Sequence, residues 1–115
     1  MNNVEKGKIG EDIATKFLEN GGAIIKERNF RGRFGEIDII SFFNTTEIVF
    51  IEVKSRSTCK YGFPAEAVDK TKQNKIKKTA QEYIMKNNLQ GISIRFDVIE
   101  VYMSDKKIRH IVNAF

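Results

Sequence analysis

The sequence predicts a single α/β domain over residues 1–115, in which a mixed five-stranded sheet is flanked by helices in the order αβββαββ. Three observations predict this fold class. The chain of 115 residues is long enough to bury one hydrophobic core without disulfides. Apolar residues recur at helical spacing over 4–20 and over 69–87. Three apolar strand-like runs separate these helices and two follow the second, each bounded by turn residues.

The first helix is expected from Val4 to Asn20, and Gly21-Gly22 supplies its C-terminal stop. Its predicted inward stripe recurs every four residues, at Ile9, Ile13 and Phe17, and Ala14 and Leu18 widen it.

Three other residues of this helix bear on function. Glu11 falls at the edge of the apolar stripe, where a boundary glutamate is ordinary. Gly7 and Gly10 each weaken a helix by about 1 kcal/mol relative to alanine. That cost indicates a close approach to something, either the sheet or a phosphate.

A short first strand is expected at Ala23–Glu27, followed by a basic, glycine-punctuated loop over 28–35. The loop interleaves Phe30 and Phe34 with arginines, a composition that suits phosphate contacts and base stacking. A surface loop whose aromatic rings pack into the core explains the same residues equally well.

The second and third strands are predicted at Glu36–Phe43 and around Ile48–Lys54, joined by a turn over 44–46 into an antiparallel hairpin. A register that places Phe43 opposite Glu47 also places Asp38 opposite Glu52, with both side chains on one face. A regular hairpin that paired Asp38 with Val53 would instead put Glu52 on the far face.

The chain after the hairpin is expected to form a polar loop, a helix and two strands. Cys59 in the loop is assigned no role, and Pro64 is expected to begin a helical region with Asp69 as the N-cap of the longer helix. Gln73 lies inside the inward stripe of that helix, one turn before Ile76, so its amide is either bonded to backbone or aimed at a ligand.

The last two strands are expected at Ile92–Met103 and Ile108–Val112, and the intervening helix predicts that the third and fourth strands are parallel. Asp97 and Glu100 are interpreted as partners of arginines, and His110 as a structural residue.

Composition narrows the function classes. A formal charge of +5 favours a polyanionic partner. A single cysteine permits no intrachain disulfide and fits the reducing cytoplasm. No apolar run reaches the length of a membrane span, and the charged first twenty residues have no apolar signal-peptide core, so no membrane partner is expected.

Asp38, Glu52 and Lys54 have the chemistry of a metal-dependent nuclease site. Side chains two residues apart on a strand share a face, so Lys54 lies beside Glu52. Mg²⁺ commonly takes one or two carboxylates, and the backbone carbonyl of Val53 is a candidate third ligand. Lys54 would orient a water or stabilise charge on phosphorus. A buried ion pair without function is the weaker alternative, since such pairs add little stability over apolar packing.

The same residues resemble the restriction-endonuclease-like, PD-(D/E)xK nuclease superfamily, although Ile37 stands where the name has proline. Residues 6–11 resemble the KGxxxE opening of archaeal-type Holliday-junction resolvases, which implies that Glu11 joins the metal site and that Gln73 acts near it. Nearly the whole chain resembles the small bacterial YraN family. The hallmarks stand here as Gly10-Glu11, Asn29-Phe30-Arg31, Gly35-Glu36-Ile37-Asp38, Phe50-Ile51-Glu52-Val53-Lys54, Pro64-Ala65-Glu66-Ala67-Val68 and Asn113-Ala114-Phe115.

The resemblance implies an endonuclease that uses Mg²⁺, with Mn²⁺ as a substitute, on DNA that includes branched or structured forms. A homodimer would suit a symmetric junction. The alternative is a nucleic-acid-binding protein that keeps the fold without turnover. The expected nucleic-acid contacts are basic side chains near the site: Lys6, Arg31, Arg33, Arg56 and Lys70.

Overall fold

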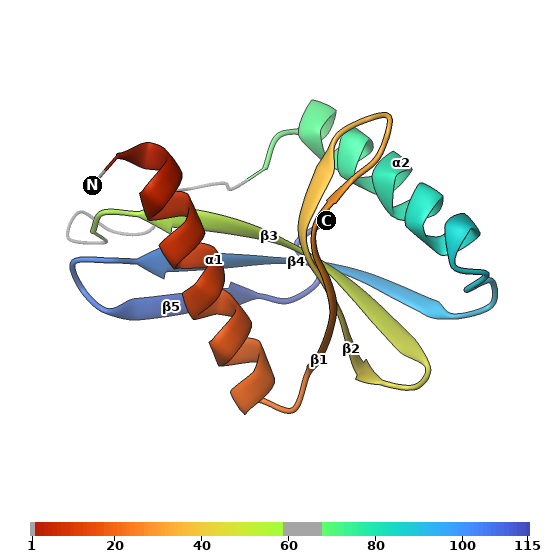
Figure 1. Ribbon diagram of the computed structural model, residues 1–115, viewed down its shortest axis with the longest axis horizontal. Coiled ribbons are helices and arrows are strands. Elements are labelled where there is room, and N and C mark those ends of the chain that lie inside the picture. The colour runs from red at the N-terminus through yellow and green to blue at the C-terminus, as the bar shows by residue number, and fades with distance from the viewer. Residues whose placement is uncertain (1, 59–67) are drawn as a thin grey trace.

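The computed structural model describes residues 2–58 and 68–115, and its elements follow the predicted order αβββαββ (Figure 1). The elements are α1 (Asn3–Asn20), β1 (Ile24–Arg31), β2 (Glu36–Asn44), β3 (Glu47–Arg56), α2 (Lys70–Lys86), β4 (Ser93–Tyr102) and β5 (Lys107–Ile111). The predictions for Cys59 and Pro64 lie outside the described residues. No helix in the described part of the chain is long and apolar enough to cross a membrane.

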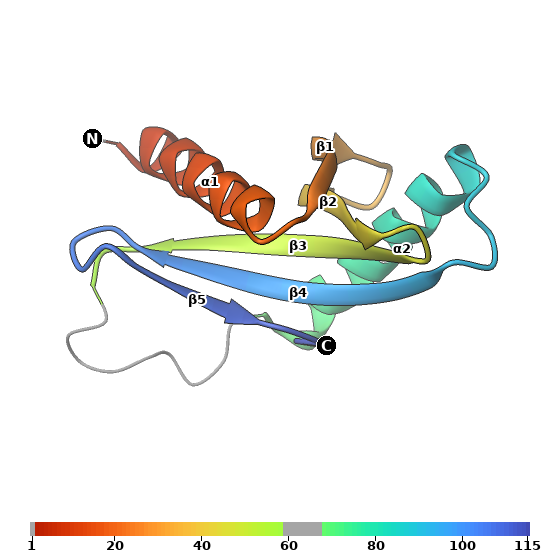
Figure 2. The same ribbon diagram turned by 90° about the horizontal axis from the view of Figure 1, so that it is seen from below.

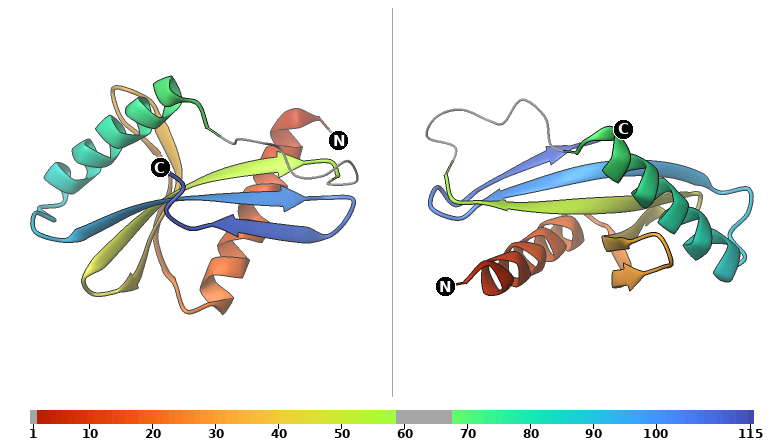
Figure 3. Two further views of the ribbon diagram at one scale, coloured as in Figure 1. Left: turned by 180° about the vertical axis from the view of Figure 1, so that it is seen from behind. Right: turned by 90° about the horizontal axis from the view of Figure 1, so that it is seen from above.

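The sheet has the strand order β1-β2-β3-β4-β5. The pairs β1–β2, β2–β3 and β4–β5 are antiparallel, and β3–β4 is parallel, as the intervening helix predicts. The helices cover opposite faces of the sheet, with the hairpin β1–β2 standing away from the plane of β3 and β4 (Figures 2 and 3).

The helix α1 is capped at both ends by its sequence. The Asn2 side chain accepts a hydrogen bond from the backbone N–H of Glu5 at 2.8 Å. At the other end Gly22 has φ +96°, and the N–H of Ala23 donates to the carbonyl of Leu18, as in a Schellman motif.

The inward face of α1 differs from the prediction. Ile9, Ile13 and Phe17 are 37–42% exposed, whereas Ala14 and Leu18 are fully buried. Small side chains at the contact let the helix axis approach β3 closely, and the larger apolar residues lie on the flank of that contact. The predicted stripe is therefore confirmed at Ala14 and Leu18 and wrong at Ile9, Ile13 and Phe17, so its centre is rotated about the helix axis.

The strand β1 is longer than predicted, because part of the expected basic loop is strand. It continues to Arg31, with a register shift between Ile25 and Glu27. Phe30 is 5% exposed and packs edge-to-face on Tyr83, while Phe34 is 43% exposed. The two phenylalanines thus divide between the two interpretations: one belongs to the core and one stays at the surface.

The β2–β3 register is the predicted one over the regular part of the hairpin. Ile39 pairs with Ile51 and Phe42 with Ile48, which gives the even sum required to put Asp38 and Glu52 on one face. The turn differs, since Asn44 rather than Phe43 pairs with Glu47 through a register shift. The Asn44 side chain accepts from the Thr46 N–H at 2.8 Å and stabilises this tighter turn.

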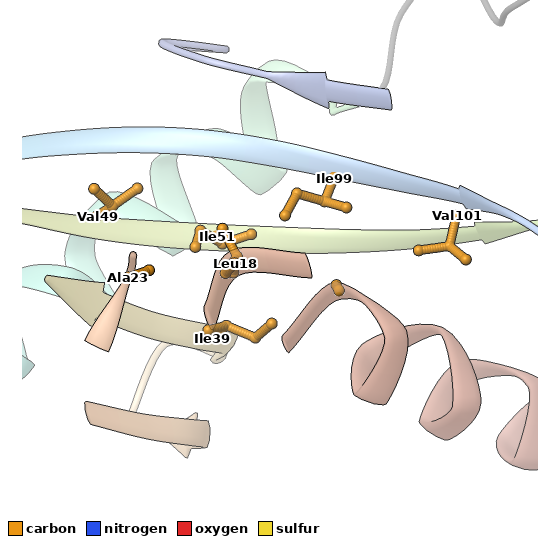
Figure 4. Close-up of a cluster of buried hydrophobic side chains, with 8 residues drawn as sticks. Leu18, Ala23, Ile39, Val49, Ile51, Ile99 and Val101 are labelled. Carbon is orange, nitrogen blue, oxygen red and sulfur yellow. The ribbon is translucent and has the colours of Figure 1, made fainter. Parts of the chain in front are cut away.

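Two hydrophobic clusters hold the layers together, one on each face of the sheet. The cluster under α1 joins Leu18 to strand residues that point toward one another, among them Ile39, Ile51 and Ile99 (Figure 4). The cluster under α2 contains Phe30, Phe50, Ile76, Ala80 and Tyr83 among its buried members. The central strands therefore have apolar side chains on both faces, as their continuous apolar runs indicate.

The acids of β4 pair with cations, as predicted. Asp97 is fully buried and binds Arg95 and His110, at 2.9 Å and 2.7 Å. Burial alone would raise the pKa of Asp97, but hydrogen bonds from His110, Arg95 and the Asn113 N–H hold it below its usual value. Glu100 accepts from the Tyr102 hydroxyl at 3.0 Å and from Arg109 at 3.2 Å.

Candidate active site at the fork of β2 and β3

The candidate site begins where β2 separates from β3. The backbone pairing between these strands ends at Ile39–Ile51. One residue further, the Asp38 carboxylate accepts a hydrogen bond from the backbone N–H of Val53 at 2.8 Å. A side-chain oxygen thus satisfies the β3 N–H at the point where the partner strand departs. This geometry fixes Asp38 at the fork.

Glu52 is the second acid of the fork, and it is only 8% exposed. Its carboxylate forms an ion pair with the Lys72 ammonium, at an oxygen-to-nitrogen distance of 2.7 Å. Lys72 reaches it because α2 begins just before, where the Asp69 side chain accepts from the Lys72 N–H at 2.8 Å and serves as the predicted N-cap. Lys72 also lies one turn before Ile76, on the face of α2 that packs against the sheet.

Glu11 reaches the same region from α1 and is 9% exposed. One of its oxygens accepts from Arg28 Nε at 3.1 Å and from Asn29 Nδ2 at 2.8 Å. Asn29 has φ 54°, a left-handed conformation that asparagine tolerates better than most residues. One of the two side chains that bind Glu11 is therefore that of Asn29, whose backbone departs from regular strand geometry.

The carboxylates of the fork repel one another. Burial, then the negative charge of Glu52 and of Glu11, raises the pKa of Asp38 to about 7. The hydrogen bond from Val53 and the charge of Lys72 act in the opposite direction without cancelling the rise. For Lys72, burial lowers the pKa, but the hydrogen bond and charge of Glu52 outweigh it, so that its pKa is raised. Both shifts indicate a site with more negative charge than its own cations neutralise.

Two cavities open at Asp38. The larger, of about 650 Å³, lies on the α1 side, and we call it the α1 groove. Its lining residues are Asn3, Val4, Lys6, Gly7, Lys8, Glu11, Arg28, Asn29, Glu36, Asp38, Val53 and Ser55. The smaller, of about 140 Å³, lies on the α2 side and is lined by Gly35, Glu36, Asp38, Glu52, Lys72, Lys75 and Ile76. Asp38 and Glu36 belong to both, so the fork is reachable from either side.

Two predicted catalytic residues, Gln73 and Lys54, do not line either cavity. Gln73 donates its amide to the backbone carbonyl of Val68 at 3.1 Å, which is the backbone-bonded alternative. Lys54 follows Glu52 by two residues on β3. Among the described residues that line the two cavities, neither Lys54 nor Gln73 occurs.

The five basic residues predicted to contact nucleic acid are spread over several elements. Lys6 lines the α1 groove, and its ammonium donates to Ser57 Oγ at 2.7 Å. Arg31 is exposed and pairs with Glu36 at 3.1 Å. The guanidinium of Arg33 lies 5.7 Å from the centre of the exposed Phe34 ring. Lys70 is exposed at the start of α2, and Arg56 has a buried Nε with no hydrogen-bond partner among the described residues.

The sequence of this chain matches known proteins over most of its length. Residues 10–101 match Uncharacterised protein family UPF0102. The chain belongs to the UPF0102 family. A UPF0102 protein of Clostridioides difficile (strain 630) is 54% identical over 115 residues, which cover 100% of both chains. A UPF0102 protein of Persephonella marina is 51% identical over 110 residues, covering 96% of this chain and 92% of its own. UPF0102 is the YraN family that the hallmark residues resemble.

The acids of this UPF0102 chain suit a divalent cation in part. The partly buried Asp38 and the buried Glu52 are oxygen donors with uncompensated negative charge, and the Lys72 ammonium already lies against Glu52 as a cation would. Mg²⁺ needs only one or two carboxylates because it keeps several waters. Within residues 2–58 and 68–115, however, no three acidic, histidine or cysteine side chains are grouped closely enough to hold an ion. One Glu11 oxygen is already bound by Arg28 and Asn29, so a metal would have to bind through the other oxygen or displace these partners.

Three residues of the UPF0102 site escaped the sequence interpretation: Arg28, Asn29 and Lys72. Arg28 was recognised only as a basic residue near the acidic strand. The signal for Lys72 was present, since it precedes Ile76 by four residues and so shares its helical face. Nothing in the sequence pattern indicated the left-handed conformation of Asn29.

Proposed function

We propose that this protein is a Mg²⁺-dependent endonuclease that hydrolyses phosphodiester bonds in DNA, including branched DNA. One observation carries the proposal: two carboxylates, the partly buried Asp38 and the buried Glu52, line one cavity at the fork, where negative charge exceeds positive charge. Buried acids without enough counter-charge destabilise a fold. Their presence is explained if a divalent cation and a polyanion complete the site. The activity we propose is cytoplasmic, and the single cysteine, which suits a reducing compartment, supports that location.

In this proposal the residues have distinct roles. Asp38 and Glu52 hold the cation, with Val53 contributing its carbonyl, and a bound Mg²⁺ supplies Lewis-acid polarisation of the phosphoryl group. The Val53 N–H orients the Asp38 carboxylate through their 2.8 Å hydrogen bond. The Lys72 ammonium, which lies 2.7 Å from the Glu52 carboxylate, would stabilise charge on a phosphate bound at the fork.

The second candidate function is nucleic-acid binding without turnover. Two observations favour it. The Lys72 ammonium forms an ion pair with Glu52 at 2.7 Å, and residues 2–58 and 68–115 contain no group of three acidic, histidine or cysteine side chains that could hold a metal ion. In this case Lys72 is a permanent counter-ion, and only the basic residues around the fork contact the nucleic acid.

Cleavage assays separate these functions. Linear, forked and four-way-junction DNA, with structured RNA as a further arm, are incubated with protein in Mg²⁺, Mn²⁺ or EDTA. We expect cleavage of DNA with either metal and none with EDTA. Asp38→Asn should abolish cleavage, because a neutral amide is a poorer ligand for a hard cation. It should not weaken binding, since it removes a negative charge near phosphate.

The matched control is Glu19→Gln, which removes an exposed carboxylate that lies at the end of α1 and lines neither cavity, and it should keep most of the activity. Salt-dependent DNA binding without cleavage of any substrate would favour the second function. A protein that binds neither metal nor nucleic acid would overturn both.

A further inference from the structure

Two glycines of α1 have opposite surroundings. A Cβ built on Gly10 would collide with Ser55 Oγ, so this position needs glycine to bring α1 against β3. A Cβ built on Gly7 would meet nothing within 4 Å. Packing within the described protein therefore explains Gly10 and does not explain Gly7, although glycine disfavours a helix at both positions.

Gly7 lies on the wall of the α1 groove that leads to the carboxylates. Val4, Gly7, Lys8 and Glu11 all line the groove, and their spacing of i, i+3, i+4 and i+7 places them along one face of the helix. Gly7 precedes Glu11 by one turn, which is about 6 Å of helical rise. A chain that enters the groove along this wall toward Glu11 and Asp38 must pass over Gly7.

The charges along this wall change from positive to negative. Lys6 and Lys8 flank Gly7, and Lys8 forms no ion pair among the described residues. Within the residues that the structure describes, the ammonium of Lys6 is held only by the neutral hydroxyl of Ser57, a partner that an anion can displace. At the inner end, Glu11, Glu36 and Asp38 are acidic. A phosphate is thus favoured at the glycine and a cation at the fork.

We propose that the groove wall at Gly7 is a subsite for a phosphodiester group of the DNA backbone, next to the phosphodiester that is cleaved at the fork. This proposal rests on the proposed function. The DNA backbone lies against the bare helix at Gly7, and the ammonium groups of Lys6 and Lys8 bind its phosphate. A side chain at residue 7 would project into the groove and occupy the space of the sugar-phosphate chain.

The test compares Gly7→Ala and Gly7→Leu with wild type by fluorescence anisotropy on a labelled four-way-junction DNA, over a series of salt concentrations in EDTA. Both variants should fold, and Gly7→Ala should melt at a higher temperature because alanine favours the helix. Both should bind DNA more weakly, with the larger loss for leucine. Loss of one phosphate contact lowers the slope of log K against log salt by about 0.9.

Asn74→Ala is the matched control. Asn74 is exposed on α2 and lines neither cavity, so this change should also favour its helix while leaving DNA affinity and the salt slope unchanged. Gly7→Leu with wild-type affinity and slope, in a protein whose wild type binds DNA, would overturn the subsite and leave the nuclease proposal standing. A wild-type protein that binds no DNA would overturn the proposed function and the subsite with it.

Discussion

Replacing Asp38 with asparagine should stabilise the metal-free protein at alkaline pH. The pKa of Asp38 is raised to about 7, chiefly by burial and then by the charges of Glu52 and Glu11. In the unfolded chain an aspartate has a pKa of about 3.9. Asparagine has no charge to bury, and its side-chain oxygen can still accept the hydrogen bond that the Val53 N–H donates to Asp38.

The size and sign of the effect follow from proton linkage. Between about pH 4 and pH 7 the folded protein holds a proton on Asp38 that the unfolded chain has released, so wild-type stability falls as pH rises. Three pKa units at 1.36 kcal/mol each set an upper bound of about 4 kcal/mol. The Asp38→Asn variant escapes this loss. It should exceed wild type by up to about 4 kcal/mol at pH 8, and the difference should vanish near pH 4.

Urea unfolding in EDTA at several pH values measures this difference. Glu36→Gln, which removes an exposed carboxylate nearby, should change stability by only about 0.5 kcal/mol or less at any of these pH values. In Mg²⁺ at pH 8, wild type should gain stability and Asp38→Asn should gain much less. Equal stabilities in EDTA at pH 8, or a difference that does not depend on pH, would refute the raised pKa of Asp38.

Two further changes test other parts of the charge network. Lys72→Met removes the ammonium that lies 2.7 Å from Glu52, so the metal-free protein should lose about 1 kcal/mol in urea unfolding. The same variant should bind Mg²⁺ more tightly by calorimetry because the competing cation is gone, and weaker binding would contradict this role. Asp97→Ala leaves Arg95 and His110 without their buried partner and should cost about 3–5 kcal/mol near neutral pH. Because the pKa of Asp97 is lowered in the folded protein, this difference should shrink as pH falls below about 4, and a difference that persists at pH 2 would show that charge is not its cause.

The sheet could be predicted closely because its determinants are local in the sequence. Side chains alternate along a strand, so the apolar residues of β2 and β3 allow few registers that bury them all. That constraint correctly placed Asp38 and Glu52 on one face. The turn was misjudged by one residue because the side chain of Asn44 supplies a hydrogen bond that alternation does not encode.

The partners of the acids could not be predicted, because they depend on distances between elements. Which face of α1 meets the sheet depends on how closely the helix axis approaches, and that approach favoured Ala14 over the larger Ile13. The choice between Lys72 and Gln73 depends on a rotation of α2 by one residue. The left-handed backbone of Asn29, which turns its amide toward Glu11, is set by tertiary contacts in a strand that also carries a register shift.

The hydrogen bond between Asp38 and the Val53 N–H makes two separate demands on one residue. Chemistry would require a negative charge at position 38, whereas folding requires only an oxygen that accepts. An apolar substitution would leave the Val53 N–H without its partner and cost about 1–3 kcal/mol, in addition to any effect on catalysis. Asparagine keeps the acceptor and removes only the charge. Alleles with alanine or valine at position 38 would therefore give a less stable protein than an asparagine allele, so only asparagine isolates the contribution of the carboxylate charge to the phenotype.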